Sequence, residues 1–188
     1  MGGFGMIIIA RYNENLDWVN NLNQPYIVIN KGDEIDLPNI KIDNISREGY
    51  SYLHYIINNY DNLDDYIVFL QGNPFDHSPK VLEKIDYYFI NKPSNFYPLS
   101  DRIVEFNLNG CQFHPGLPLI ESYKYIFNED TDNEKTLTFG AGGQFIVSKE
   151  LILKHPKEFY VKLFSLLEKD SVLEWVYERF WGLIFNEV

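Results

Sequence analysis

The sequence contains one cysteine, Cys111, and no apolar run that approaches the ~20 residues needed to span a bilayer. A single thiol excludes an intrachain disulfide framework and leaves no thiolate cluster for zinc. One cysteine is typical of a reducing compartment, so we expect a cytoplasmic or similarly reducing location and no membrane span. The four histidines are scattered without the spacing of a zinc hydrolase: His54, His77, His114 and His155.

Basic residues are scarce as well. Lysine and arginine number 16 against 27 aspartates and glutamates, which gives a formal net charge of −11. Such a charge argues against a nucleic acid or an anionic membrane surface as the main partner. A bound divalent cation, or a small anion held locally, stays compatible with it.

The apolar residues that are present predict an α/β fold. The length of 188 residues suits one domain spanning residues 1–188. Short apolar runs predict strands at residues 6–10, 25–29, 66–70 and 144–147, with a further short one at 103–106. Helical signals lie between them: one or two turns within 15–22, a helix capped by Ser46, one starting at Ser78-Pro79, one at 149–155 capped by Ser148, one opened by Pro156 and one at 172–185.

The alternation of strands and helices predicts a largely parallel sheet. Residues 92–118 are rich in proline and predict loops, and residues 128–135 predict a solvated surface loop. Ligands of such sheets bind beyond the carboxyl ends of the strands. Two polar segments fall there, residues 11–14 after the first strand and 71–77 after the third. We therefore expect a ligand site at this edge.

Several charged residues in these segments allow two interpretations each. Asp76 can hold Mg²⁺ or Mn²⁺ beside a diphosphate, with His77 as a nitrogen ligand, or it can simply stabilise a helix start. Arg47 opposes the dipole of the helix it begins, which indicates a phosphate site, although a surface ion pair with Glu48 is the alternative. Residues 11–14 either bind a nucleotide, with Tyr12 on the base and Arg11 on a phosphate, or form a polar loop.

Three further segments are candidates. Glu178 can act as a general base, or it can form a structural pair with Arg179. Residues 139–144 offer a glycine-rich backbone to a ligand but match neither a dinucleotide fingerprint nor a P-loop. Asp130-Thr131-Asp132 matches the Asp-x-Asp pattern of metal-dependent sugar transferases, yet no strand precedes it, and a solvated loop is the simpler interpretation.

Several blocks occur in a recognisable order: IIIARYNENLDWV, SREGYSYLHYIINNYDNL, YIVFLQGNPFDH, GAGGQFIVSKELILKHPKEFY and YERFWGLIF. Together they resemble a widespread family long catalogued as of unknown function. They are also similar to a small glycosyltransferase domain encoded by large algal DNA viruses, a rhamnosyltransferase in at least one case. The resemblance covers nearly the whole chain and would place it in a host cytoplasm if it is viral.

The resemblance implies a single GT-A-like domain that uses a nucleotide-diphosphate sugar and Mn²⁺ or Mg²⁺. The sequence departs from the family pattern at two places: it has only Asp76 where an Asp-x-Asp motif is usual, and it has Ser46 where glycine is usual. The implied donor and nucleotide residues are Arg11, Tyr12, Asn13, Glu14, Arg47, Gln71, Gly72 and Asn73. The implied sugar and acceptor residues are His114, Gly142, Gly143, Gln144, Arg179 and Trp181. Asp76 and His77 are the expected metal ligands, and Glu178 and Asp76 the expected catalytic residues.

Three functions follow from these observations. The first is a glycosyltransferase that moves a sugar, most simply from a UDP-sugar, to a glycan or other hydroxyl acceptor. The second is an inactive module of the same fold that binds a nucleotide or a glycan. The third is a phosphohydrolase or nucleotidyl enzyme, which would need a denser cluster of carboxylates or histidines than this sequence contains.

Overall fold

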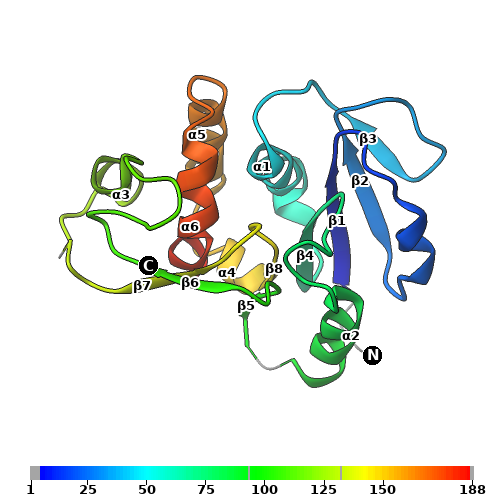
Figure 1. Cartoon of the computed structure of the whole chain (residues 1–188). Coiled ribbons are helices and arrows are strands. Elements are labelled where there is room, and N and C mark those ends of the chain that lie inside the picture. The colour runs from blue at the N-terminus through cyan, green and yellow to red at the C-terminus, as the bar shows by residue number, and fades with distance from the viewer. Residues whose placement is uncertain (1–4, 93, 132, 187–188) are drawn as a thin grey trace.

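The computed structural model describes residues 5–92, 94–131 and 133–186, and within them a six-stranded sheet runs through the centre (Figure 1). Its strands lie in the order β3 (Asn39–Lys41), β2 (Tyr26–Asn30), β1 (Gly5–Arg11), β4 (Tyr66–Gln71), β8 (Phe145–Ser148) and β5 (Phe96–Pro98). The first four are mutually parallel, whereas β8 is antiparallel to both β4 and β5. The expected α/β class, with a mostly parallel sheet flanked by helices, is confirmed.

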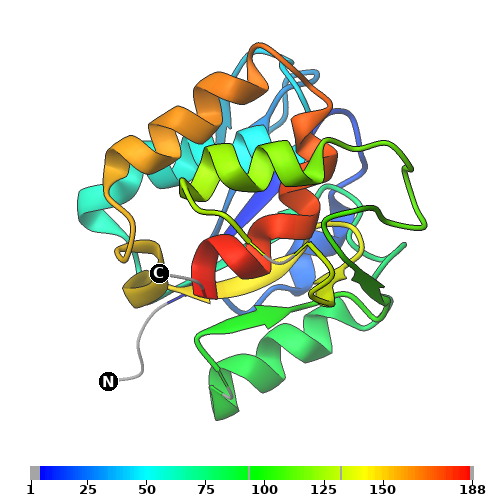
Figure 2. The same ribbon diagram turned by 90° about the vertical axis from the view of Figure 1, so that its left-hand side faces the viewer.

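The sheet is buried on both faces because its central strands are almost wholly apolar. On β1, Ile8 and Ala10 belong to one core cluster, while Ile7 and Ile9 belong to the other. Figure 2 shows α2 on the opposite side of the sheet from α5 and α6. The first face carries α1 (Glu48–Asn59, extended by the 3-10 turn η2, Tyr60–Asn62), α4 (Lys149–Ile152), α5 (Lys157–Leu167) and α6 (Leu173–Asn186), and the second carries the 3-10 helix η1 (Asp17–Asn21) and α2 (Val81–Asn91).

A smaller unit lies beside α6 (Figure 1). It consists of an antiparallel pair, β6 (Ile103–Phe106) and β7 (Leu137–Gly140), and of helix α3 (Leu119–Phe127). Phe106 and Phe139 of the strand pair and Tyr123 of α3 join the core cluster that contains α6. The strand at 103–106 was expected, but β3, β5, β7 and α3 were not, and the predicted loop within 92–118 contains β5 and β6.

Two predicted helix starts are wrong. Ser46 has a φ of 52° and does not cap α1, whose N-cap position is occupied by Arg47. Helix α2 begins at Val81 rather than at Ser78-Pro79, because the Ser78 hydroxyl donates to the carbonyl of Leu99 instead of capping a helix. In contrast, Ser148 caps α4 as expected, since its Oγ accepts from the backbone N–H of Leu151.

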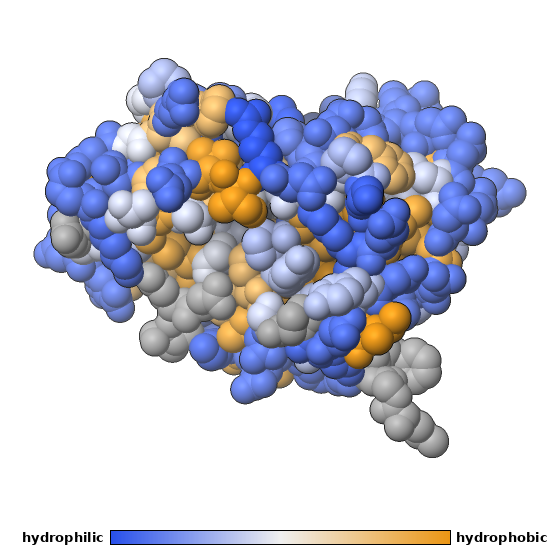
Figure 3. Space-filling model, turned by 60° about the horizontal axis from the view of Figure 1, so that its bottom comes forward, coloured by the Kyte–Doolittle hydropathy of each residue, from blue (hydrophilic) through white to orange (hydrophobic). Residues whose placement is uncertain are grey.

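The face of the molecule drawn in Figure 3 is predominantly polar. Seen from the lower side of the molecule, apolar side chains are scattered between hydrophilic ones (Figure 3). The most exposed large apolar residue is Ile90 on α2, at 80%. None of the helices in the described part of the chain has the length and apolar character of a membrane span.

Candidate functional site

A cleft of about 440 Å³ opens where β1, β2 and β4 end and α1 begins. We call it the strand-end cleft. It contains eight of the residues expected to form a site: Arg11, Tyr12, Glu14, Arg47, Gln71, Gly72, Asn73 and Asp76. Asn13 and His77 are not among its lining residues. The parallel strands bring these residues together from three separate stretches of sequence, as expected for the carboxyl edge of such a sheet.

Arg11 is held in a fixed orientation on the wall of the cleft. Its Nε donates to the carbonyl of Glu14 at 3.0 Å, and its Nη1 donates to Asn30 Oδ1 at 2.9 Å and to the carbonyl of Asp33 at 3.1 Å. Asn13 supports the same loop, because its Oδ1 accepts from the backbone N–H of Asp33 at 2.8 Å. Within the described residues no bond to Nη2 of Arg11 is found, so this group is the one available to a ligand.

Tyr12 presents a free aromatic ring beside Arg11. The carboxylate of Glu14 accepts from the backbone N–H of Tyr12 at 2.7 Å, which fixes the turn, while Tyr12 as a whole residue stays 52% exposed. A Cβ on Gly72 would lie only 2.7 Å from Glu14 Oε2, so any larger residue here would displace the Glu14 side chain. The Nε1 of Trp18 donates to the carbonyl of Gly72 at 3.0 Å and supports this wall of the cleft from behind.

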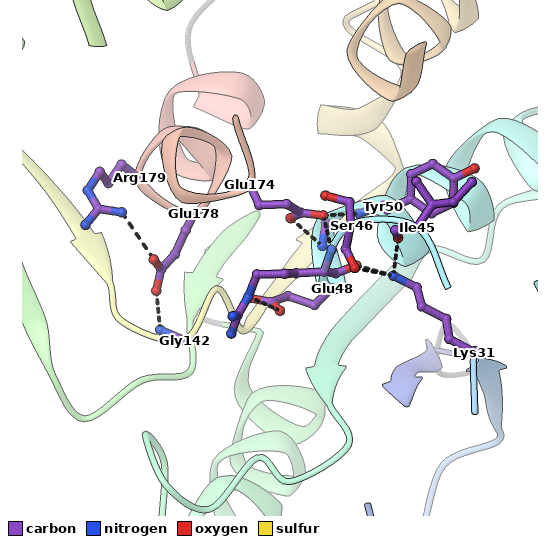
Figure 4. Close-up of polar contacts among 11 residues, drawn as sticks. Lys31, Ile45, Ser46, Glu48, Tyr50, Gly142, Glu174, Glu178 and Arg179 are labelled. Carbon is purple, nitrogen blue, oxygen red and sulfur yellow. Dashed lines mark hydrogen bonds and ion pairs between the residues drawn. The ribbon is translucent and has the colours of Figure 1, made fainter. Parts of the chain in front are cut away.

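The N-terminus of α1 is capped by a carboxylate from α6. Glu174 is 4% exposed, and its oxygens accept from the backbone N–H groups of Arg47 at 2.8 Å, Gly49 at 3.0 Å and Tyr50 at 3.0 Å (Figure 4). The prediction that the backbone N–H groups at the start of α1 bind a phosphate is therefore wrong. The N–H groups that would bind a phosphate are already bound to Glu174, and only the side chain of Arg47 remains for an anion.

The guanidinium group of Arg47 lies over the ring of Trp175, 4.5 Å from its centroid, and the Arg47 side chain is 51% exposed. Its Nε is 3.6 Å from the carboxylate of Glu48. The ring of His114 also stacks on Trp175, with 3.9 Å between centroids. Trp175 thus positions Arg47 at the edge of the strand-end cleft and fixes His114 close by, although His114 does not line the cleft.

Lys31 is a cleft residue that the sequence interpretation missed. Its ammonium group donates to the carbonyls of Ile45 at 2.8 Å, Ser46 at 3.3 Å and Arg47 at 2.5 Å, and so ties the end of β2 to the start of α1 (Figure 4). Burial lowers the pKa of Lys31 to about 8. Its position directly after a predicted strand was the available signal, but the Asn-Lys-Gly-Asp context indicated only a turn.

A second hollow, of about 380 Å³, lies between β5, β8, β7 and α6. We call it the aromatic pocket, because Phe96, Phe145 and Trp181 line it together with Glu178, Gly143 and Gln144. Gln144 separates it from the strand-end cleft: its Oε1 accepts from the backbone N–H of Gln71 at 3.3 Å and its Nε2 donates to the carbonyl of Pro74 at 3.1 Å. The expected sugar and acceptor residues Gly143, Gln144 and Trp181 therefore share one pocket.

Glu178 and Arg179 both take part in structural bonds. Glu178 Oε1 accepts from the backbone N–H of Gly142 at 2.6 Å, and Oε2 lies 3.2 Å from Arg179 Nη1 (Figure 4). Arg179 is 1% exposed and donates to the carbonyls of Trp175 at 2.5 Å and Phe113 at 2.9 Å. Arg179 lines neither hollow, so it acts on this region by holding α6 and the loop around Phe113 together.

The residues present fit only one kind of metal site. Across residues 5–92, 94–131 and 133–186, no three His, Cys, Asp or Glu side chains gather as a metal-binding group. Asp76 alone fits a Mg²⁺ or Mn²⁺ ion whose other ligands are phosphate oxygens and water. His77, the second expected ligand, packs its ring against Gly142 and does not line the cleft with Asp76. Of the Asp-x-Asp match, Asp130 pairs with Lys124 at 2.8 Å on the surface, and Asp132 lies outside the described residues.

Comparison with curated proteins and with solved structures finds no match. A family model does match, over residues 6–92 and 112–188, and its description is "Protein of unknown function (DUF3431)". All residues of the strand-end cleft fall within the first matched range. The unmatched stretch between the two ranges contains β5 and β6. Because the match covers most of its length, the chain belongs to the DUF3431 family.

Proposed function

We propose that this protein transfers a sugar from a nucleotide-diphosphate donor, most simply a UDP-sugar, to a hydroxyl group of a glycan or another acceptor. The observation that supports this best is the convergence of Arg11, Arg47 and Asp76 on one cleft at the carboxyl ends of parallel strands. Guanidinium groups suit a diphosphate, and a lone carboxylate suits the cation that accompanies one. The GT-A-like character of the fold belongs to the same proposal.

In this proposal the strand-end cleft takes the nucleotide diphosphate. The exposed ring of Tyr12 stacks on the base, while Nη2 of Arg11 and the guanidinium group of Arg47 contact the phosphates. Both arginines are already oriented, Arg11 by its bonds to Asn30 and Asp33 and Arg47 by the ring of Trp175. Such preorganised cations stabilise the charge that develops on a leaving diphosphate.

The aromatic pocket takes the acceptor. Its apolar rings suit the faces of a sugar, and Glu178 and Gln144 provide polar groups on its wall. A divalent cation bound at Asp76 would neutralise part of the charge on the leaving group. Gln144, which bonds to the backbone of both Gln71 and Pro74, keeps the two hollows in a fixed relation across the wall that separates them.

A second function is favoured by one observation. The described residues provide a single exposed cleft carboxylate, Asp76, and no metal-binding group of three. A domain with this arrangement can bind a nucleotide or a glycan without turning it over. Donor hydrolysis separates the two proposals, because active transferases commonly release some donor sugar to water.

The experiment is an assay of UDP release from a panel of UDP-sugars in the presence of Mn²⁺. We expect release by the wild type and by the control Asp61→Ala, which removes an exposed carboxylate on η2. We expect a loss of about 100-fold or more in Asp76→Ala, because the cation on the diphosphate loses its protein ligand. Binding of UDP without release from any donor would favour the module, and failure to bind UDP would refute both the transfer from UDP-sugars and a module that binds UDP.

A further inference from the structure

Three glutamates meet where α1 and α6 pack together: Glu48, Glu174 and Glu178 (Figure 4). Two of them have structural partners. Glu174 accepts three backbone N–H groups at the start of α1, and Glu178 accepts from Gly142 at 2.6 Å and lies 3.2 Å from Arg179. Glu48 differs, because the polar partners found for its side chain in the described part of the chain are local: Arg47 Nε at 3.6 Å and the backbone N–H of Glu48 itself.

Glu48 also lies between the two hollows. It lines the strand-end cleft, where its side chain is 16% exposed. Its Oε1 would be 3.8 Å from a Cβ on Gly143, and Gly143 lines the aromatic pocket with Glu178 and Trp181. Glu48 is thus a carboxyl group that lines the cleft proposed for the donor and lies next to a lining residue of the pocket proposed for the acceptor.

The surroundings of Glu48 suit a group that exchanges a proton. The charged and titratable groups around it are Arg47 before α1, Lys31 after β2, Tyr52 on α1 and Glu174 and Glu178 on α6. Burial, followed by the nearby charge of Glu174, raises the pKa of Glu48 to about 7, against the opposing effect of Arg47. A carboxyl group with such a pKa is half deprotonated at neutral pH, which is the condition for an effective general base.

We propose that Glu48, rather than Glu178, accepts the proton of the acceptor hydroxyl. This inference rests on the proposed transferase function. In the step, the acceptor O–H bond breaks and its proton passes to a carboxylate oxygen of Glu48. The acceptor oxygen forms the bond to the anomeric carbon of the sugar. The bond from that carbon to the donor oxygen breaks, and its electron pair leaves with the nucleotide diphosphate.

The test compares Glu48→Gln with Glu178→Gln over a range of pH, using the UDP-sugar that the wild type turns over. Glu83→Gln, an exposed position in the first turn of α2, is the control for the loss of one negative charge. We expect Glu48→Gln to lower kcat about 100-fold to 10,000-fold, with little change in UDP affinity, and to remove the rise in rate with pH around 7. Glu178→Gln should keep that rise, and Glu48→Asp should restore part of it.

The possible results separate this inference from the function on which it rests. A wild type that releases UDP, with a pH profile that Glu48→Gln leaves intact and Glu178→Gln removes, would refute the role of Glu48 alone. A wild type that neither binds UDP nor releases it would refute the transferase and this role with it. Carboxyl ¹³C NMR of glutamate-labelled apo protein adds a readout independent of turnover: a resonance titrating near pH 7 must disappear in Glu48→Gln and persist in Glu178→Gln, and any other pattern contradicts the assignment.

Discussion

Glu174 supplies from α6 the capping group that the sequence before α1 lacks. Ser46, which precedes the helix, has a left-handed backbone and leaves its Oγ buried without a partner in the described part of the chain. The carboxylate of Glu174 satisfies three N–H groups that would otherwise be unpaired, and it carries the negative charge that a helix N-terminus favours. One side chain therefore fixes both the start of α1 and its packing on α6.

We expect Glu174→Ala to lower the free energy of unfolding by about 2–4 kcal/mol, because two buried N–H groups and one partly buried N–H group lose their acceptor. Glu174→Gln should cost less, since its carbonyl oxygen can still accept. Urea denaturation followed by circular dichroism measures both changes. Glu83→Ala, in the exposed first turn of α2, is the matched control. Equal stability of Glu174→Ala and Glu83→Ala would contradict the capping role.

The pKa of Glu48 predicts a pH dependence of stability. The folded pKa of about 7 lies above the ordinary value of 4.5, so the folded protein binds this proton more tightly than the unfolded chain. The resulting stability is complete below pH 4.5 and is lost as the pH rises through 7. Glu48→Gln stays neutral, and its stability relative to the wild type should rise across this interval by on the order of 3 kcal/mol. Denaturation midpoints from pH 4 to 8 test this, and a constant difference between the two proteins would refute it.

The residues of the strand-end cleft were partly predictable from sequence. Arg11 directly follows one apolar run and Asp76 lies in the segment 71–77 that follows another, and the carboxyl edge of a parallel sheet brings such segments together. Glu174 and Lys31 were not predictable in their roles. Glu174 bonds to Arg47, which is 127 residues away, and Lys31 bonds to Ile45, which is 14 residues away. No local sequence pattern specifies such contacts.

At the scale of elements, the turn between β7 and β8 contains two glycines with a left-handed backbone, Gly142 and Gly143, and Gly142 is also closely packed. Gly142 has a φ of 89°, and a Cβ there would lie 2.5 Å from Cδ2 of His77. Its backbone N–H donates to Glu178. The turn therefore combines a left-handed backbone, a close contact with the loop after β4 and a bond to α6.

Gly142→Ala and Gly116→Ala separate these effects. Gly116 has a similar φ of 86°, but nothing lies within 4 Å of a Cβ at this position. We expect Gly116→Ala to cost about 1–2 kcal/mol from backbone strain alone. Gly142→Ala should cost at least about 1 kcal/mol more, because His77 must move. Thermal and urea denaturation measure both, and equal losses would show that the contact with His77 is unimportant.

Elements with strong local patterns were predictable, and those defined by distant partners were not. The apolar runs of β1, β2 and β4 and the helical stripe of α1 carry their own signal. Strands β3 and β5 have three residues each, and β5 forms only by pairing with β8, which is far away in sequence. The direction of β8 was also not predictable, because an apolar run of four residues is the same in either orientation.

At the scale of the whole molecule, the negative net charge contrasts with the cations of the strand-end cleft. The chain carries a formal charge of −11, whereas Arg11, Lys31 and Arg47 all line one cleft, together with three carboxyl side chains, Glu14, Glu48 and Asp76. A small anion can contact the guanidinium groups of this cleft directly, whereas an extended polyanion also meets the negative charge of the rest of the molecule. Selectivity for a small anion over an extended polyanion follows from this distribution.

We expect the affinity for UDP to fall by on the order of tenfold when salt rises from about 0.01 M to 1 M, since the screening length shortens from roughly 30 Å to 3 Å. The affinity for uridine, which lacks the diphosphate, should change little. Arg47→Ala should weaken UDP far more than uridine and flatten the salt dependence. Isothermal titration calorimetry gives these values, and an equal loss for both ligands in Arg47→Ala would argue against a phosphate contact.

The positions of the three tryptophans have a practical consequence. Trp18 bonds to Gly72 behind the strand-end cleft, Trp175 lies under Arg47, and Trp181 lines the aromatic pocket. Every indole of the chain therefore borders a region that a ligand would enter. Intrinsic fluorescence, excited selectively at the red edge of the absorption band, should report occupancy without any label, and single Trp→Phe replacements would tell which of the two hollows has been filled.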